Sequence, residues 1–218
     1  MIVVRNLYLK YVREYYALHD INFKVEQNES VAFVGQEESG KTSMLRILAK
    51  LEEPTRGEVY IRDIPLKKLN LLTDIKMGYL PSTPIFFENK TVEQNLKWLL
   101  KEQKVPKYEI GTKINDALIE FNIQSIKDKK IKELTIYEKY LVSFARLYFR
   151  DLDIILIDDI FLSCTQEQID VLKEIIKKHY LGKSTMIIAT NDKQLAEQIC
   201  QKQIYFESGS IMEDKNEK

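Results

Sequence analysis

The chain has 218 residues, and its 33 Lys and Arg balance its 33 Asp and Glu, so its formal net charge at neutral pH is zero. The length suits one domain of generous size or one domain with an insertion. A neutral chain has no long-range attraction to nucleic acid or anionic lipid, and we therefore expect no nucleic-acid partner. Low net charge also leaves little repulsion between chains, which favours association with a protein partner.

Two cysteines, Cys164 and Cys200, form neither a disulfide framework nor a zinc-binding pattern, so we expect reduced thiols. The N-terminal residues lack the apolar run of a signal peptide. No stretch approaches the roughly 20 apolar residues that a membrane-spanning helix needs. We therefore expect a cytoplasmic protein, for which any link to a membrane must pass through another chain.

The first part of the chain predicts strands, because it contains short runs rich in β-branched and aromatic residues. We expect these strands at 2–8, 17–25, 30–34, 58–62 and 75–80. After the third of them, apolar residues recur with helical spacing over 42–51.

The middle of the chain, from 91 to about 148, is rich in Lys and Glu and predicts helices. Strands return at 153–157 and 184–190, as continuous apolar runs typical of strands that are buried on both faces. An amphipathic helix is expected between them, at 166–180. Strands that alternate with helices indicate a parallel sheet.

These elements predict a single α/β domain with an insertion. We expect residues 1–83 and 149–218 to form its core and 84–148 to form an inserted helical subdomain. The polar tail at 212–218 is expected to be frayed.

One segment directly after the strand at 30–34 fits the pattern G-x-x-x-x-G-K-[ST]. It comprises Gly35, Gln36, Glu37, Glu38, Ser39, Gly40, Lys41 and Thr42, and Ser43 follows it. Glycines let the backbone curl so that successive N–H groups face phosphate oxygens. Lys41 is expected to reach the β- and γ-phosphates and Thr42 to ligate Mg²⁺, while the following helix directs its positive end at the anion. The pattern predicts binding of ATP with Mg²⁺.

Glu37 and Glu38 are unusual in a loop that must hold a polyanion. If their side chains point outward, the effect on affinity is small. If they face the phosphates, affinity falls.

The whole chain resembles the ATP-binding subunits of ABC transporters, with matching segments in the same order. They are KLEEPTRGEVYIRD from Lys50, MGYLPSTPIFFENKTVEQNL from Met77, LTIYEKYLVSFARLYFRDLDIILIDD from Leu134, STMIIATND from Ser184 and IYFESGSI from Ile204. The resemblance implies a P-loop NTPase (RecA-like) core with an N-terminal antiparallel β-subdomain and an inserted helical subdomain.

The resemblance also implies roles for single residues. Tyr11 lies at the position of the aromatic residue that stacks on adenine; the alternative is a core or surface tyrosine. Asp158 matches the carboxylate that holds Mg²⁺; for the adjacent pair Asp158 and Asp159, the alternative is a turn at the end of a strand.

Three catalytic positions depart from the family pattern. Asp159 stands where a glutamate positions the attacking water, and its side chain is shorter by one methylene, about 1.5 Å. Asn191 replaces the histidine of the H-loop. Ser82 replaces the glutamine of the Q-loop, where the resemblance implies a contact to the metal, and its side chain is too short to span the same gap.

The signature sequence LSGGQ also departs, because Leu134 is followed by Thr135, Ile136, Tyr137 and Glu138. Bulky side chains thereby replace both glycines, where the backbone would approach the γ-phosphate held by a partner subunit. The aspartate of the D-loop is replaced by Thr165. Losing one transition-state donor costs about 10²–10³-fold in rate, so we expect slow hydrolysis in a homodimer and in a heterodimer with another ABC ATPase subunit.

Three functions follow as hypotheses. The first is the ATP-binding subunit of an ABC-type membrane transporter or membrane-remodelling complex, a weak ATPase coupled to a separate integral-membrane permease that docks near 82–88. The second is a non-hydrolytic ATP-sensing module with a regulatory or structural role. The third, a P-loop enzyme acting on nucleic acid or a small molecule, is weaker, because aromatic and basic residues are not interleaved as single-strand binders require.

Overall fold

The computed structural model describes residues 1–12, 15–71 and 73–212, and the expected frayed tail lies outside them apart from Met212. The chain divides into two compact units. The first comprises Met1–Tyr79, Leu152–Asp159 and Ile176–Lys218. The second comprises Leu80–Asp151 and Ile160–Ile175.

The first unit contains an antiparallel sheet of four strands. Its strands are β1 (Ile2–Val12), β2 (Tyr15–Val25), β4 (Arg56–Ile61) and β5 (Ile64–Pro65), in the order β2-β1-β4-β5. β1 continues four residues beyond the expected end at Tyr8, because its second half pairs with β2 through Leu9 opposite Leu18. This sheet is the antiparallel β-subdomain predicted from the sequence.

A mixed sheet of six strands forms the centre of the first unit. Its strands are β3 (Ser30–Val34), β6 (Met77–Leu80), β7 (Ile154–Asp158), β8 (Thr185–Thr190), β9 (Lys202–Glu207) and β10 (Ser210–Ile211), in the order β10-β9-β3-β8-β7-β6. β3 runs parallel to both β8 and β9, and β7 runs parallel to β8. Every residue of β3, β7 and β8 is buried, as their continuous apolar sequences predict.

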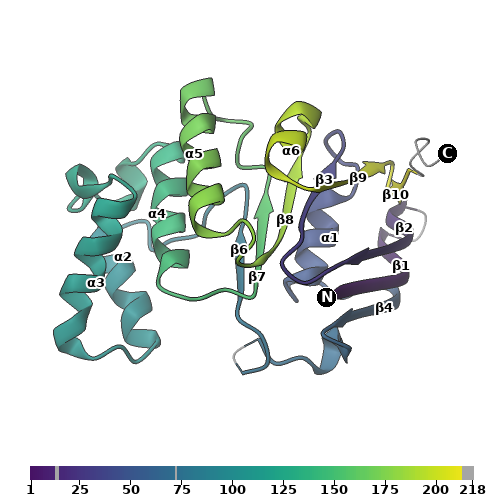
Figure 1. Ribbon diagram of the computed structural model, residues 1–218, viewed down its shortest axis with the longest axis horizontal. Helices are drawn as coiled ribbons and strands as arrows, with labels where there is room; N and C mark the ends of the chain where they lie inside the picture. The colour runs from purple at the N-terminus through teal and green to yellow at the C-terminus, as the bar shows by residue number, and fades with distance from the viewer. Residues whose placement is uncertain (13–14, 72, 213–218) are drawn as a thin grey trace. The chain divides into compact units, whose positions relative to one another are not determined.

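Helix α1 (Lys41–Leu48) follows β3 and packs among the strands of this unit (Figure 1). Its buried residues Met44, Leu45 and Leu48 share one hydrophobic core with residues of both sheets. The helix ends before the expected 51, because Lys50 adopts a left-handed φ of 56°. Helix α6 (Lys193–Ile199) contacts β3, β8 and β9.

The second unit is mainly helical. It contains α2 (Val92–Glu102), α3 (Lys107–Glu120), α4 (Ile136–Tyr148), the short 3₁₀ turns η2 (Gln124–Ile126) and η3 (Ile131–Glu133), and most of α5 (Gln166–His179). Helices α2, α3 and α4 contact one another, and side chains such as Leu96, Leu118 and Phe144 are fully buried or nearly so.

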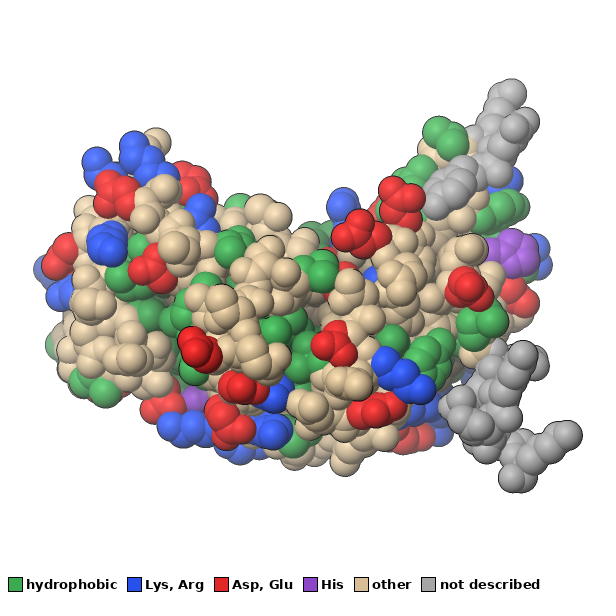
Figure 2. Space-filling view, turned by 90° about the horizontal axis from the view of Figure 1, so that it is seen from above, with side chains coloured by type: hydrophobic (Ala, Val, Ile, Leu, Met, Phe, Trp, Pro, Cys, Tyr) green, Lys and Arg blue, Asp and Glu red, His purple; other side chains and the backbone are tan. Residues whose placement is uncertain are grey.

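Charged side chains of both signs are interspersed over the face shown in Figure 2, in keeping with the balanced composition. Within the described ranges, no helix combines the length and the apolar character needed to span a membrane.

Candidate functional site

The loop between β3 and α1 is held in a fixed conformation by its glycines and by β8. The N–H of Gly35 donates to the carbonyl of Thr190 at 3.2 Å. Gly40 has a φ of 104°, and a Cβ atom there would lie 2.8 Å from the carbonyl oxygen of Ala17. Helix α1 then begins without a side-chain cap, so the first amides of the helix are left for another acceptor.

Lys41 forms a buried positive centre inside this loop. Its side chain is 4% exposed, and Nζ donates to the carbonyl oxygens of Gly35 at 2.9 Å and Gln36 at 2.8 Å. Nζ also lies 3.7 Å from a carboxylate oxygen of Asp159. The loop therefore positions a lysine cation that is already desolvated and surrounded by oxygen atoms.

Asp158, at the end of β7, is 1% exposed and is held by two hydroxyl groups. Thr42 Oγ1 donates to Oδ1 at 2.9 Å, and the hydroxyl of Tyr79 donates to Oδ2 at 3.1 Å. Burial raises the pKa of Asp158, and the two hydrogen bonds oppose that rise. Burial, followed by the charge of Asp158, raises the pKa of Tyr79, so its hydroxyl stays protonated and remains a donor.

Asp159 and Ser39 carry buried polar atoms that have no hydrogen-bond partner in the described part of the chain. These atoms are Oδ1 of Asp159 and Oγ of Ser39. Burial raises the pKa of Asp159, Lys41 lowers it, and the charges of Asp158 and Glu37 raise it further. Such atoms in native structures call for a ligand or an ordered water, so the residues present fit a ligand that offers both donor and acceptor groups.

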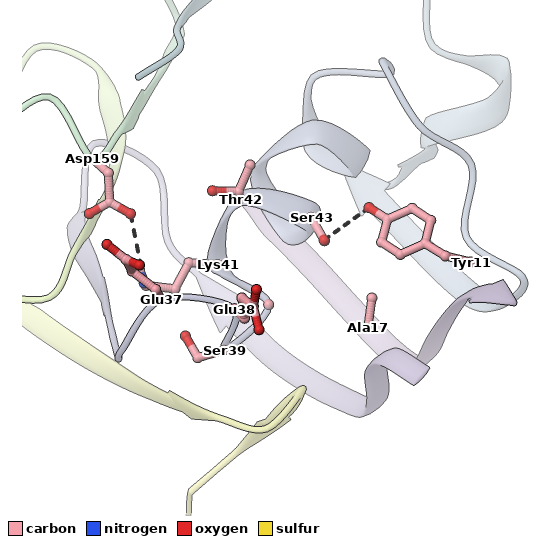
Figure 3. A pocket seen from close by; sticks show the side chains of 10 residues that line it. Tyr11, Ala17, Glu37, Glu38, Ser39, Lys41, Thr42, Ser43 and Asp159 are labelled. Atoms are coloured by element: carbon pink, nitrogen blue, oxygen red, sulfur yellow. Dashed lines mark hydrogen bonds and ion pairs between the residues drawn. The ribbon is translucent and has the colours of Figure 1, made fainter. Parts of the chain in front are cut away.

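A cavity of about 470 Å³ opens beside the loop. It is lined by Tyr11, Ala17, Glu37, Glu38, Ser39, Gly40, Lys41, Thr42, Ser43 and Asp159 (Figure 3). Tyr11 lies at one end, beyond Ser43, and Asp159 lies at the other, beyond Lys41. The Tyr11 hydroxyl donates to Glu52 at 2.9 Å and lies 3.0 Å from Ser43 Oγ, while 53% of the residue is exposed. The cavity thus has one end formed by the ion pair of Lys41 and Asp159 and another formed by the aromatic ring of Tyr11.

Glu37 and Glu38 are exposed and both line this cavity. Their charges therefore lie next to the space that a ligand would occupy, and Glu37 is close enough to raise the pKa of Asp159. Glu38 adopts a left-handed φ of 61°, which is unfavourable for a residue with a side chain.

Several of the predicted site residues do not line the cavity. Asn191 is exposed after the end of β8, and Gly35 and Gln36 contribute carbonyl oxygens to Lys41. Ser82 belongs to the second unit, where its side chain is exposed and its carbonyl oxygen accepts the hydroxyl of Tyr140 at 2.7 Å.

The signature positions begin helix α4 in the second unit and form a capping box. Thr135 Oγ1 accepts from the N–H of Glu138 at 3.2 Å, and the Glu138 carboxylate accepts from the N–H of Thr135 at 2.7 Å. Ile136 and Tyr137 occupy the first turn and are half-buried. The side chains of Thr135 and Glu138 therefore provide hydrogen-bond acceptors for two backbone N–H groups at the start of this helix.

Two residues of the site were missed by the sequence reasoning. Ala17 lines the cavity from β2, and Tyr79 reaches Asp158 from β6. Ala17 belongs to none of the matching segments, and Tyr79 lies in the segment that begins at Met77 but has no role implied by the resemblance. Tyr79 lies in the predicted strand at 75–80, but its contact with Asp158 depends on the pairing of distant strands.

Comparison with known proteins gives the class to which this fold and site belong. Residues 18–161 match the ABC transporter family, and the chain belongs to this family. The chain is 26% identical over 220 residues to the methionine import ATP-binding protein MetN 2 of Bacillus cereus, which covers 97% of this chain and 64% of that protein. It is 31% identical over 196 residues to a putative ABC transporter ATP-binding protein of Clostridium tetani, which covers 88% of this chain and 44% of that protein. The chain thus spans less than two thirds of the length of both relatives.

The fold is confirmed by a solved structure, the dimeric ATP-binding cassette MJ0796 in a post-hydrolysis state bound to ADP and Pi. It superposes with a TM-score of 0.86 at 22% identity and covers 97% of this chain and 96% of its own. The predicted P-loop NTPase core, with its β-subdomain and helical insertion, is therefore correct.

Proposed function

We propose that this chain binds Mg-ATP in the cavity beside the phosphate loop. The observation that carries the proposal is the buried Lys41, fixed by loop carbonyls at the start of a helix whose first amides are uncapped. Thr42 and Asp158 would hold Mg²⁺, which neutralises phosphate charge when it is bound. The half-exposed ring of Tyr11 is the proposed surface for the adenine base.

The proposed role is that of the ATP-binding subunit of an ABC-type membrane transporter or remodelling complex. Membership of the ABC transporter family supports this role. The names of the relatives, which are ATP-binding proteins of transport systems, support it as well. The chain would act at the inner face of the membrane through a separate integral-membrane permease, as a homodimer or with another ABC ATPase subunit. The dimeric cassette among the structural relatives supports such pairing.

An exposed apolar surface in the second unit suits the proposed permease. Ile85 is 78% exposed, and Phe87 packs edge-on against Trp98 with ring centroids 5.0 Å apart while both rings stay partly exposed. The test introduces a charge with Ile85→Lys and measures co-purification with the permease. A matched control is Ile119→Lys, which changes another exposed isoleucine on α3. Equal recovery of the permease with both variants would contradict docking at this surface.

We further propose that hydrolysis is slow. Asp159 is shorter than the glutamate of the family pattern, and its carboxylate lies 3.7 Å from Lys41. Displacing a reacting group by about 1 Å costs on the order of 100-fold in rate. The substitutions at Asn191 and at the signature positions should also lower the rate of hydrolysis.

The second candidate is a non-hydrolytic ATP-sensing module, in which bound nucleotide sets a conformation. One observation favours it specifically: the capping box of Thr135 and Glu138 places a carboxylate on the start of α4, where the family resemblance expects backbone to face a phosphate. That carboxylate would repel the anion.

Turnover measurements decide between the two candidates. Purified protein, alone and with its partner, is assayed as wild type and as Asp159→Glu. A slow rate that rises with Asp159→Glu supports a weak ATPase limited by the short carboxylate. Bound ATP without turnover in either form supports the sensing module. A wild-type rate near the general enzyme median of about 10 s⁻¹ would contradict both slow hydrolysis and a non-hydrolytic module.

A further inference from the structure

Tyr79 contacts the proposed magnesium ligand, although the family resemblance implies no role for it. It comes from β6, whereas Asp158 ends β7 and Thr42 belongs to the first turn of α1. Three elements that are far apart in sequence thus converge on one carboxylate. The two hydroxyl groups approach different oxygens of that carboxylate, since Thr42 bonds to Oδ1 and Tyr79 bonds to Oδ2.

The two hydrogen bonds are not equivalent. Thr42 Oγ1 gives its proton to Asp158 and keeps lone pairs that can face a cation, so it serves the metal as well as the carboxylate. Tyr79 is not among the described residues that line the cavity, and its hydroxyl donates to Asp158. Tyr79 therefore acts on Asp158, the proposed metal ligand, without lining the space that a nucleotide would occupy.

A carboxylate has a broad, roughly two-fold preference about its terminal bond, so a single anchor leaves its plane free to turn. Two anchors on different oxygens define the plane. Asp158 is 1% exposed, so water cannot replace the anchor on Oδ2 without entering the core. The Tyr79 hydroxyl is thus the group that keeps Oδ1 next to Thr42.

We infer that Tyr79 is a positioning residue for cation binding, which holds Asp158 by Oδ2 so that Oδ1 and Thr42 together face the Mg²⁺ of the bound nucleotide. This inference rests on the proposed function, because it assigns Tyr79 to the same site. Partners that orient a metal ligand typically contribute 10- to 100-fold in metal affinity. The effect should therefore appear in the Mg²⁺ requirement rather than in the binding of nucleotide itself.

The test compares Tyr79→Phe with Tyr60→Phe in the full chain. Both substitutions delete a tyrosine hydroxyl that donates to a carboxylate, since Tyr60 donates to Glu58 at 2.8 Å on β4. A fluorescent ATP analogue is titrated in EDTA and then at increasing Mg²⁺. For Tyr79→Phe we expect unchanged affinity for the analogue in EDTA. The Mg²⁺ concentration that gives half of the maximal effect on this affinity should be raised about 10-fold. Tyr60→Phe should match the wild type in both.

Asp158→Asn separates this inference from the proposal on which it rests. If wild type binds no nucleotide, or if Asp158→Asn keeps the full Mg²⁺ effect, the proposed function fails. If Asp158→Asn loses that effect while Tyr79→Phe keeps the wild-type Mg²⁺ requirement, the role of Tyr79 alone is overturned.

Thermal unfolding of the nucleotide-free variants distinguishes positioning from a purely structural role. A lower midpoint for Tyr79→Phe with an unchanged Mg²⁺ requirement would overturn the inference, as would an equal loss of affinity with and without Mg²⁺. A raised Mg²⁺ requirement at unchanged affinity in EDTA supports it.

Discussion

Two helix starts in this chain, those of α1 and α4, are built in opposite ways. The first amides of any helix lack partners within the helix and form a site for an anion. Gly40 precedes α1 without a side-chain cap, and the buried cation of Lys41 lies in the first turn. Thr135 precedes α4 and closes its first turn together with the carboxylate of Glu138.

The ABC resemblance implies two functions together, namely binding a nucleotide on this chain and contacting a nucleotide held by a partner subunit. The contrast between the two helix starts separates them. The start of α1 is open and positively charged, so it suits phosphate on this chain. The start of α4 is occupied by its own side chains and negatively charged, so it suits a phosphate on a partner poorly. We therefore expect nucleotide binding to survive in the isolated chain and the contribution of α4 to a shared site to be small.

The largest effect is expected from Lys41→Ala, which removes the cation from the open helix start. Truncating one member of a buried, hydrogen-bonded charge pair costs about 2–5 kcal/mol, so ATP affinity should fall at least about 30-fold. Calorimetry or a fluorescent analogue measures the affinity. Lys24→Ala is the control, because Lys24 is exposed and pairs with Glu26 away from the cavity. Equal affinities for the two variants would place the nucleotide elsewhere.

Gly40→Ala should damage the same helix start through the backbone. A Cβ there would lie 2.8 Å from both Ala17 O and a side-chain carbon of Leu18, at a φ of 104°. We expect a loss of about 2 kcal/mol in unfolding free energy, which lowers the unfolding midpoint by about 4–8 °C.

Gly111→Ala is the matched control for that loss. Gly111 lies inside α3 with open space around its Cβ position, so alanine should stabilise the helix by up to about 1 kcal/mol. The two substitutions should therefore shift the midpoint in opposite directions. A shift of the same sign for both would show that the loop is not constrained at Gly40.

The phosphate loop was predictable because its chemistry lies in eight consecutive residues. Lys41 and Thr42 follow the two glycines at fixed spacing, and the loop begins where the buried strand β3 ends. The same reasoning did not find Tyr79, because its contact with Asp158 arises only when β6 and β7 enter one sheet. Local pattern carries information about local geometry and not about strand order.

The start of α4 shows a different limit of the sequence. The substitutions at Ile136 and Tyr137 indicated lost backbone access, and that expectation depended on the resemblance. The reciprocal bonds of Thr135 and Glu138 follow from the general capping pattern, a hydroxyl residue three positions before Glu. The capping pattern occupies the same positions as the family signature, so comparison with the signature alone does not reveal it.

Thr135→Ala tests whether the cap of α4 is only structural. Loss of an N-cap costs about 1 kcal/mol, so the midpoint should fall by about 2–4 °C while ATP affinity of the isolated chain stays unchanged. Thr91→Ala is the comparison, because Thr91 caps α2 through the same kind of box with Gln94. Similar stability losses support a structural cap. A fall in ATP affinity for Thr135→Ala alone would contradict the contrast between the two helix starts.

The smallest effect is expected from the acidic residues of the loop itself. Glu37 and Glu38 line the cavity, so each repels the phosphates through solvent-exposed space. Glu37→Gln and Glu38→Gln should each raise ATP affinity by about 2- to 5-fold at low salt, and the gain should shrink as salt screens the charges.

Glu38→Gly separates charge from backbone conformation. Glu38 holds a φ of 61°, where glycine has no steric cost, so this variant should gain stability that Glu38→Gln does not. Both variants should share the gain in affinity, because both remove the charge. Affinities that do not change with either variant, at any ionic strength, would mean that the open helix start of α1 already dominates the field in the cavity, and that the two glutamates point their charge into solvent when nucleotide is bound.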